Sequence, residues 1–214
     1  MFKKVWVYLS EILRISCYIR TTELLGNDSD VELLKAVAQK NTDAFKVFMV
    51  RFQERVYRTV FRFVPDPEVA RDLVQDIFIK AYNAASSYSP DAELFTWLYR
   101  IIANHCINFL QKQKKDPIHR AEDVLDQQFS SLPDTEHAAS QLSIMEKQER
   151  ALAVRRALDG LPPRQRMAIT LLRFEDLSYQ EIAKTLDCSV SAVESLIFRG
   201  METFKKILTR ELER

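Results

Sequence analysis

Aromatic residues alternate along one short stretch of this 214-residue chain, and an arginine follows them directly. Phe95, Trp97 and Tyr99 cannot all lie on one side of a helix, so at least one is expected outside the core. Exposed aromatic rings beside a guanidinium such as that of Arg100 are typical of surfaces on which unpaired bases stack, at roughly 1–3 kcal/mol per base. The stretch therefore predicts a contact with single-stranded nucleic acid.

Residues 179–197 have the spacing of a helix-turn-helix motif. Two short helices that pack at a steep angle need a small residue where they touch, and Ala183 has that place. Asp187 lies in the turn, where aspartate tolerates a left-handed backbone better than most residues. The apolar contacts are expected from Ile182, Leu186, Val190, Val193 and either Leu196 or Ile197. An ordinary helical hairpin that binds nothing has the same pattern, so DNA binding is one of two interpretations.

Charge limits the affinity of this motif for DNA. Residues 178–214 carry six lysines and arginines against six aspartates and glutamates, so their formal charges cancel. Because affinity for duplex DNA comes largely from neutralised phosphates, the segment is expected to bind weakly by itself. We expect a partner to supply the remaining affinity.

A basic stripe runs along an earlier segment, where Arg51, Arg55, Arg58 and Arg62 follow one another at steps of three and four residues. The stripe has two interpretations. It is either a solvated helix face opposite an apolar core or a track that contacts phosphates.

The remaining composition excludes several classes of enzyme. The three glycines, Gly26, Gly160 and Gly200, are far apart, whereas P-loops and Rossmann loops need clustered glycines. The cysteines and histidines lack metal-ligand spacing, so neither a metal nor another cofactor is expected. They are Cys17, Cys106, Cys188, His105, His119 and His137. No catalytic grouping of side chains is present, so the sequence predicts neither an enzyme nor a small-molecule substrate.

Helical periodicity predicts an all-α fold of two small helical domains, which the 47% hydrophobic content suffices to pack. The first is expected over 28–115 and the second over 140–214. Between them, residues 116–139 hold six acids, one arginine and two prolines, which is typical of a flexible acidic linker. Residues 1–27 are an N-terminal extension, and Glu11 and Arg14 interrupt its apolar run, so we expect no signal peptide and a cytoplasmic protein.

Capping residues mark where several helices begin. Ser29 and Ser178 each open a sequence of the capping-box form, with a glutamate three positions later. Asp66 precedes a proline, a common helix start, and a break between two helices is expected near Asn41. The composition of residues 84–91 predicts a loop, and a long helix that contains Phe95, Trp97 and Tyr99 is expected after it.

Four stretches spread over residues 28–212 follow a known order of motifs. They are Asp72–Tyr82, Phe95–Ile101 with Asn104, Leu161–Arg166 and Leu177–Ala183. In this order they resemble an RNA polymerase sigma factor of the extracytoplasmic-function (ECF) group, sigma-70 family. The resemblance implies a domain like sigma region 2 and a helix-turn-helix domain like sigma region 4, joined by the linker, and leaves the first 27 residues outside.

The resemblance also implies three sets of contact residues. Core-polymerase binding, on the clamp helices of the largest subunit, falls to Asp72, Gln75, Asp76 and Phe78. Recognition and opening of the −10 promoter element, with one base flipped out of the stack, falls to Trp97, Arg100 and Asn104. Recognition of the −35 element falls to Ser189, Ser191, Ala192, Glu194, Ser195 and Arg199.

The −35 set departs from the commonest pattern of the family. Many relatives carry arginines where this chain has Glu194, Leu196 and Met201. Arginine reads guanine with two hydrogen bonds, whereas glutamate accepts from cytosine or repels phosphate, so the preferred DNA sequence stays open. Arg199, Lys205 and the adjacent Lys206 are the candidates for phosphate contacts.

The resemblance thus predicts a non-catalytic transcription initiation factor, of the kind used in stress responses, that binds core RNA polymerase and promoter DNA. The acidic linker is expected in the polymerase's basic active-site and RNA-exit channel, and an anti-sigma factor is the implied inhibitor. The alternative is a stand-alone helix-turn-helix regulator that binds an operator without polymerase. The balanced charge of residues 178–214 speaks against that alternative.

Overall fold

The computed structural model describes residues 30–89, 93–115 and 141–213. All regular structure in these ranges is helical, which confirms the all-α prediction. The chain divides into two compact units, Met1–Cys106 and Ile107–Arg214, and the division falls within one long helix. The expected extension, linker and Ser29 cap lie outside the described residues, so the domain limits at 115 and 140 stay predictions.

The first unit consists of helices, and two of them start where the sequence predicts. They are α3 (Asp30–Ala38), α4 (Thr42–Phe63), α5 (Pro67–Ala84), the 3₁₀ turn η1 (Ala85–Ser87) and α6 (Leu94–Lys115), which runs on into the second unit. The Asn41 side chain accepts from the N–H groups of Asp43 and Ala44 and so begins α4. Asp66 caps α5 in the same way, with Pro67 in the first turn. Both predicted starts are confirmed.

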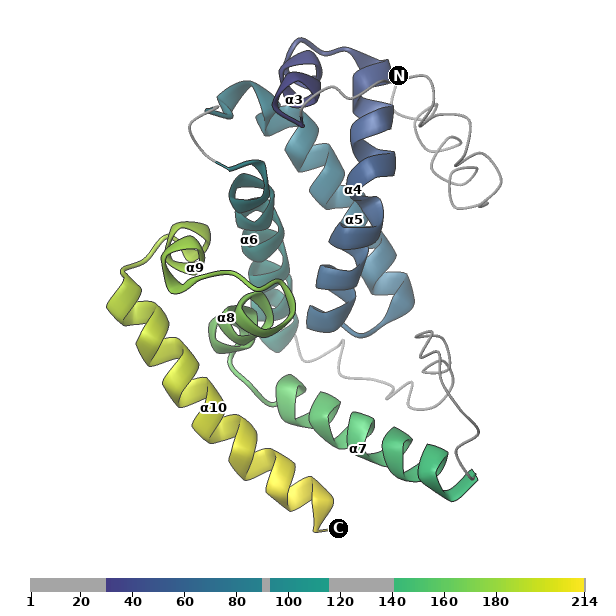
Figure 1. The fold of residues 1–214 in the computed structure, drawn as a ribbon, viewed down its shortest axis with the longest axis vertical. Coiled ribbons are helices and arrows are strands. Elements are labelled where there is room, and N and C mark those ends of the chain that lie inside the picture. Colours follow the sequence, from purple (N-terminus) through teal and green to yellow (C-terminus); the bar gives the residue numbers. More distant parts are fainter. Residues whose placement is uncertain (1–29, 90–92, 116–140, 214) are drawn as a thin grey trace. The chain divides into compact units, whose positions relative to one another are not determined.

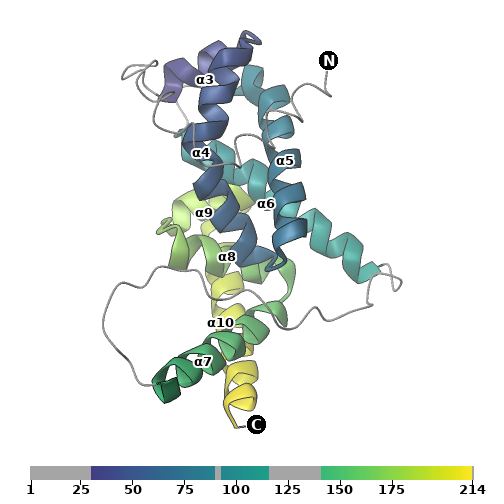
Figure 2. The same ribbon diagram turned by 90° about the vertical axis from the view of Figure 1, so that its right-hand side faces the viewer.

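The core of the first unit lies where α4 packs against α3 and α5 (Figure 1, Figure 2). Phe48, Phe63 and Ile77 are completely buried there. The ring of Phe48 meets that of Phe78 edge-on, with centroids 6.1 Å apart. Each such side chain stabilises the fold by about 1.5–3 kcal/mol, so this core fixes the faces that α5 leaves exposed.

In the second unit, the other helices pack against one long helix, α10 (Val190–Leu212). They are α7 (Gln141–Asp159), α8 (Pro163–Phe174) and α9 (Tyr179–Leu186). Helix α10, yellow in Figure 1, contacts each of the other three. Gly200 allows one close approach, because a Cβ there would lie 2.8 Å from the Cδ1 of Ile169 on α8.

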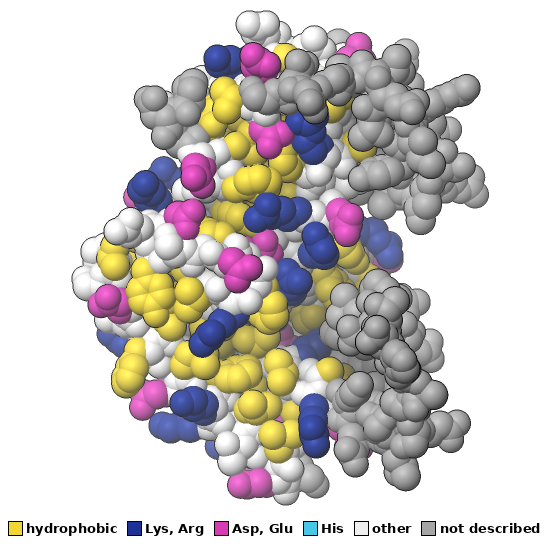
Figure 3. All heavy atoms as spheres, viewed as in Figure 1, with side chains coloured by type: hydrophobic (Ala, Val, Ile, Leu, Met, Phe, Trp, Pro, Cys, Tyr) yellow, Lys and Arg dark blue, Asp and Glu magenta, His cyan; other side chains and the backbone are white. Residues whose placement is uncertain are grey.

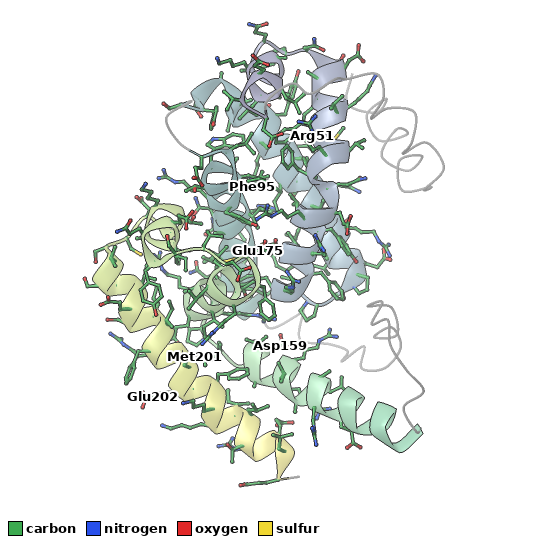
Figure 4. All side chains as sticks on the ribbon, in the orientation of Figure 1. Arg51, Phe95, Asp159, Glu175, Met201 and Glu202 are labelled. Carbon is green, nitrogen blue, oxygen red and sulfur yellow. The ribbon has the colours of Figure 1, made fainter. Side chains whose placement is uncertain are left out.

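An ion pair between a buried arginine and an exposed aspartate joins α7 to α8. Arg166, 4% exposed, places Nη2 2.5 Å from Oδ1 of Asp159 at the end of α7, which Figure 4 labels. Charge-assisted hydrogen bonds of this kind fix the angle between consecutive helices. Among the described residues, no helix has the length and apolar character needed to cross a membrane.

Candidate nucleic-acid and partner interfaces

Helices α9 and α10 form the predicted helix-turn-helix. Ser178 begins α9 with a complete capping box: its Oγ accepts from the Glu181 N–H at 3.3 Å, and Glu181 Oε2 accepts from the Ser178 N–H at 2.7 Å. The Ser178 hydroxyl also donates to Glu181 Oε2 at 2.6 Å, and this bond, with the one from the Ser178 N–H, lowers the pKa of the Glu181 carboxyl. Asp187 ends α9 with φ at 52°, in the predicted left-handed conformation. Both local signals in the sequence are confirmed.

The two helices pack through most of the expected apolar side chains. Ile182 and Val193 are completely buried and Ala183 is 7% exposed. Of the two candidates near the end of the motif, Ile197 is buried and Leu196 only half-buried. The prediction for Val190 is wrong: it is the first residue of α10, and at 39% exposure it is not part of this buried contact.

A surface pocket of about 460 Å³ lies where α8 meets the start of α10. It collects five of the six residues predicted for the −35 set, together with Arg164, Gln165 and Leu196. Those five are Ser189, Ser191, Ala192, Ser195 and Arg199. The pocket therefore combines two guanidinium groups and three hydroxyls beside the N-terminus of a long helix. That is a composition suited to phosphate oxygens.

Hydrogen bonds within the protein position several side chains of this pocket. The Ser189 hydroxyl accepts from the Ala192 N–H at 3.2 Å and lies 3.0 Å from the Ser191 hydroxyl. Arg164 donates from Nη2 to the Leu186 carbonyl at 2.9 Å, which holds its guanidinium beside the turn. Arg164 lies in the Leu161–Arg166 motif, but the sequence assigns it no role, because its place beside α10 depends on how α8 packs against α10.

Glu194, the sixth residue of the set, is exposed but does not line the pocket. One turn later on the same side, Phe198 is 67% exposed, and sequence analysis missed it. Its position outside the apolar stripe of α10 was the available signal. Met201 is half-buried and Glu202 exposed, and Figure 4 labels both on α10. The exposed side of α10 near its start thus carries the carboxylate of Glu194 and the exposed aromatic ring of Phe198.

On the face of the molecule drawn in Figure 3, basic and acidic side chains are interspersed. Lys and Arg (dark blue) lie among Asp and Glu (magenta), with hydrophobic side chains between them. This face therefore lacks the extended basic field that drives strong non-specific DNA binding.

In the first unit, the aromatic run opens α6. Tyr99 is buried at 2% exposure, whereas Phe95 and Trp97 are half-buried, so the prediction that one ring lies outside the core holds. Trp97 meets Tyr88 edge-on at 5.6 Å between centroids, and burial raises the pKa of the Tyr88 hydroxyl. Arg100 is exposed.

Asn104 is exposed as well, one turn after Arg100. Trp97, Arg100 and Asn104 follow at steps of three and four residues, so they share one face of α6. The structure therefore brings the predicted −10 residues together on a single surface.

On α5, the predicted polymerase-binding residues divide between surface and core. Asp72 and Asp76 are exposed and Gln75 is half-buried. Phe78 is 3% exposed and packs on Phe48, so its predicted place among the surface contacts is corrected: it is a core residue. Its neighbour Ile79, which sequence analysis missed, is 42% exposed.

Asp76 also lies close to α6, since its Oδ2 is 3.3 Å from Nε2 of His105. The acidic face of α5 therefore borders the helix that bears Trp97.

The arginine stripe on α4 is largely engaged within the protein. Arg51, labelled in Figure 4, places Nη1 2.7 Å from Asp30 Oδ1, and Arg55 contacts aromatic rings of α6. Arg58 is exposed, 3.8 Å from Glu54. Arg51, Arg55 and Arg58 thus contact other side chains of the protein, and both interpretations of the stripe stay predictions.

Within the described residues, an all-helical fold with a helix-turn-helix beside an arginine- and serine-lined pocket is typical of the helix-turn-helix class of DNA-binding proteins. Comparison with known families narrows this class. Residues 48–116 match the model described as sigma-70 region 2, and residues 151–204 match sigma-70, region 4.

Two curated relatives cover most of the chain. The ECF RNA polymerase sigma-E factor of Escherichia coli (strain K12) is 38% identical over 175 residues, which span 81% of this chain and 91% of the relative. The RNA polymerase sigma-H factor of Pseudomonas aeruginosa is 33% identical over 192 residues, or 86% and 96% of the two chains. This chain therefore belongs to the ECF group of the sigma-70 family, the promoter-recognising factors of transcription initiation.

Two solved structures share the fold. CnrH, in complex with the cytosolic domain of CnrY, is 24% identical with a TM-score of 0.58 and covers 86% of this chain and 99% of that one. The sigma factor RpoE of Bartonella quintana, in complex with the anti-sigma factor NepR, is 21% identical with a TM-score of 0.55 and covers 77% and 96%.

Proposed function

We propose that this chain binds core RNA polymerase, directs it to promoters with defined −10 and −35 elements, and opens the DNA. The observation that carries the proposal is that the two units carry different kinds of surface. The second unit has a helix-turn-helix beside a pocket whose lining suits phosphate oxygens, and the first has a face of α6 with an aromatic ring and an arginine.

For core binding, we propose the acidic face of α5. Asp72, Gln75 and Asp76 lie at helical spacing above a packed core, with the exposed Ile79 one turn further on. Carboxylates around an apolar centre are suited to a basic partner helix, because charge complementarity orients the encounter and the apolar contact lowers the dissociation rate.

For promoter opening, we propose that Trp97 stacks against an unpaired base of the −10 element while Arg100 and Asn104 contact its backbone or edges. Flipping a base costs a few kcal/mol, and stacking on an indole offsets roughly 1–3 kcal/mol of this. Because Trp97 packs edge-on against Tyr88, one face of its ring is held in a fixed direction.

For the −35 element, we propose that phosphate oxygens enter the pocket of Arg164 and Arg199 while Glu194 faces base edges. A carboxylate accepts a hydrogen bond from the cytosine amino group, so this position favours cytosine over guanine on the contacted strand. The neighbouring Phe198 adds an apolar surface suited to a thymine methyl group.

We further propose that the chain catalyses no reaction itself, acts in the cytoplasm where polymerase and chromosome meet, and is held inactive by an anti-sigma factor. Among the described residues, no group of three or more histidine, cysteine, aspartate or glutamate side chains is arranged to hold a metal ion. The exposed Phe198, Leu212 and Ile79 are apolar surfaces that an inhibitor would cover.

In vitro transcription tests the proposal directly. Purified chain and core polymerase are incubated with a library of promoter fragments, and the transcripts are sequenced. The proposal expects initiation at a defined subset of fragments that share two spaced elements, with no transcript when the chain is omitted. Initiation that is the same with and without the chain would contradict it.

A further inference from the structure

Arg55, in the middle of α4, is half-buried and contacts two aromatic residues near the start of α6. Its guanidinium carbon lies 3.9 Å from the ring centroid of Phe95 and 5.5 Å from that of Tyr99. Its Nε donates a hydrogen bond of 2.8 Å to the Tyr99 hydroxyl, across 44 residues of sequence. One arginine therefore contacts two successive turns of α6.

The rings around Arg55 are fixed from other sides as well. Phe52, which is 3% exposed, meets Phe95 edge-on with centroids 5.5 Å apart. Tyr99 is 2% exposed, and its ring centroid lies 6.3 Å from that of Phe95. Figure 4 labels Phe95 on α6, in the part of the helix next to α4. The planar guanidinium of Arg55 stacks on the Phe95 ring, and its Nε donates a hydrogen bond to the Tyr99 hydroxyl. Together these two contacts restrain both rotation and translation of α6.

The restrained turns are the ones that bear the proposed −10 contacts. Trp97 lies between Phe95 and Tyr99 in sequence and on another side of the helix, and Arg100 follows Tyr99 directly. A rotation of the first turns of α6 changes the directions of Trp97 and Arg100 together. The orientation of the DNA-facing side thus depends on the contacts made behind it.

We propose that Arg55 is a positioning residue for promoter opening: its contacts with Phe95 and Tyr99 hold α6 so that Trp97 and Arg100 meet the −10 DNA correctly. The inference rests on the proposed function. It differs from the phosphate-track interpretation of the stripe, because the guanidinium is occupied by α6 and acts through Trp97. Arg58, one turn further along α4, is exposed and 3.8 Å from Glu54, and it supplies a matched control.

The test uses holoenzyme reconstituted from core polymerase and the full chain, as wild type, Arg55→Met, Tyr99→Phe or Arg58→Met. Three quantities are measured: affinity for core, closed-complex formation in the cold, and the rate of strand opening followed by permanganate reactivity of thymines. We expect Arg55→Met to keep core affinity and closed-complex formation within about twofold and to open about tenfold more slowly. That factor is typical of losing one cation–π contact and one charge-assisted hydrogen bond.

A pre-opened promoter separates positioning from a general loss of structure. On a template with a mismatched −10 bubble, strand separation is already provided, so Arg55→Met is expected to initiate at the wild-type rate. Tyr99→Phe keeps the ring packing and removes only the hydroxyl, so it tests the same contact in a chain that stays folded. It is expected to open about threefold more slowly and to recover on the bubble template, since only one uncharged acceptor is lost.

Several outcomes would overturn the inference. One is opening at the wild-type rate by both Arg55→Met and Tyr99→Phe, and another is a defect that persists on the bubble template. An equal defect in Arg58→Met would indicate that the stripe contacts phosphates after all. A wild-type chain that directs no transcription would instead contradict the proposed function, so the two failures are distinguishable.

Discussion

Replacing Ser178 by alanine removes the side-chain half of the capping box that begins α9. In the structure, the Ser178 hydroxyl accepts from the Glu181 N–H at 3.3 Å and donates to Glu181 Oε2 at 2.6 Å. The Ser178 N–H keeps its own bond to Glu181 Oε2 at 2.7 Å. Loss of an N-cap hydroxyl costs about 1 kcal/mol of helix stability, within a usual range of roughly 0.5–2 kcal/mol.

Amide hydrogen exchange is the assay that reports on the stability of α9. The two tryptophans, Trp6 and Trp97, both precede the second unit, so their fluorescence does not report on α9. A loss of about 1 kcal/mol raises the open population of α9 about fivefold, and amide exchange over Tyr179–Leu186 accelerates by that factor. Exchange within α4 is expected to stay unchanged and serves as the internal reference.

The effect of Ser178→Ala is also expected to depend on pH. The Ser178 hydrogen bonds lower the pKa of Glu181, so the ionised carboxylate stabilises the folded state. This contribution is fully present above the unfolded-state pKa, near 4.5, and is lost as the pH falls through the lower folded-state pKa. The difference between wild type and variant therefore narrows below about pH 4.5, once intrinsic exchange rates are corrected.

Ser178→Thr is the matched control, because threonine keeps the capping hydroxyl and costs only a few tenths of a kcal/mol. Exchange of α9 that is as fast in the threonine variant as in the alanine variant would refute the capping argument. So would protection that is the same in Ser178→Ala and wild type.

Three further predictions concern the proposed contacts. Gln75→Ala combined with Asp76→Ala is expected to weaken core binding about tenfold in titrations, with helix content unchanged by circular dichroism, since it removes surface charge. Trp97→Ala is expected to slow strand opening by roughly five- to a hundredfold, the loss of one stacked base, with little change in closed complex by permanganate footprinting. Glu194→Arg is expected to shift the selected base pair towards guanine by roughly 1–3 kcal/mol in a binding-site selection.

Each of these predictions has a contrary result. Unchanged co-purification of the double variant with core would remove α5 from the polymerase interface. Equal losses of closed and open complexes in Trp97→Ala would deny it a specific role in opening. Identical selected sequences for wild type and Glu194→Arg would rule out base reading at that position.

Local signals predicted the frame of both units. Asn41, Asp66 and Ser178 begin helices as expected, because a short polar side chain satisfies the free N–H groups of a first turn wherever the rest of the chain lies. Asp187 was also predictable, since aspartate is, with glycine and asparagine, one of the few residues that tolerate a left-handed backbone. These features need only neighbours in sequence.

Features that depend on distant neighbours were harder to predict. Arg55 looked like one member of an exposed stripe until the fold brought Phe95 and Tyr99 over it. For Phe78 the family resemblance implied a surface contact, whereas helical spacing places it beside the apolar stripe of α5, and the structure buries its ring while Ile79 faces outwards. Arg164 likewise joins the α10 pocket through tertiary contact between α8 and α10.

Promoter binding measured with and without core polymerase tests the central claim most directly. Labelled promoter duplex is titrated with the chain alone, with core alone and with both, at one fixed physiological salt concentration. We predict tight, sequence-specific binding only when both proteins are present, and weak binding by the chain alone because the charges of residues 178–214 cancel. Tight specific binding by the chain alone, with no association with core, would contradict the account.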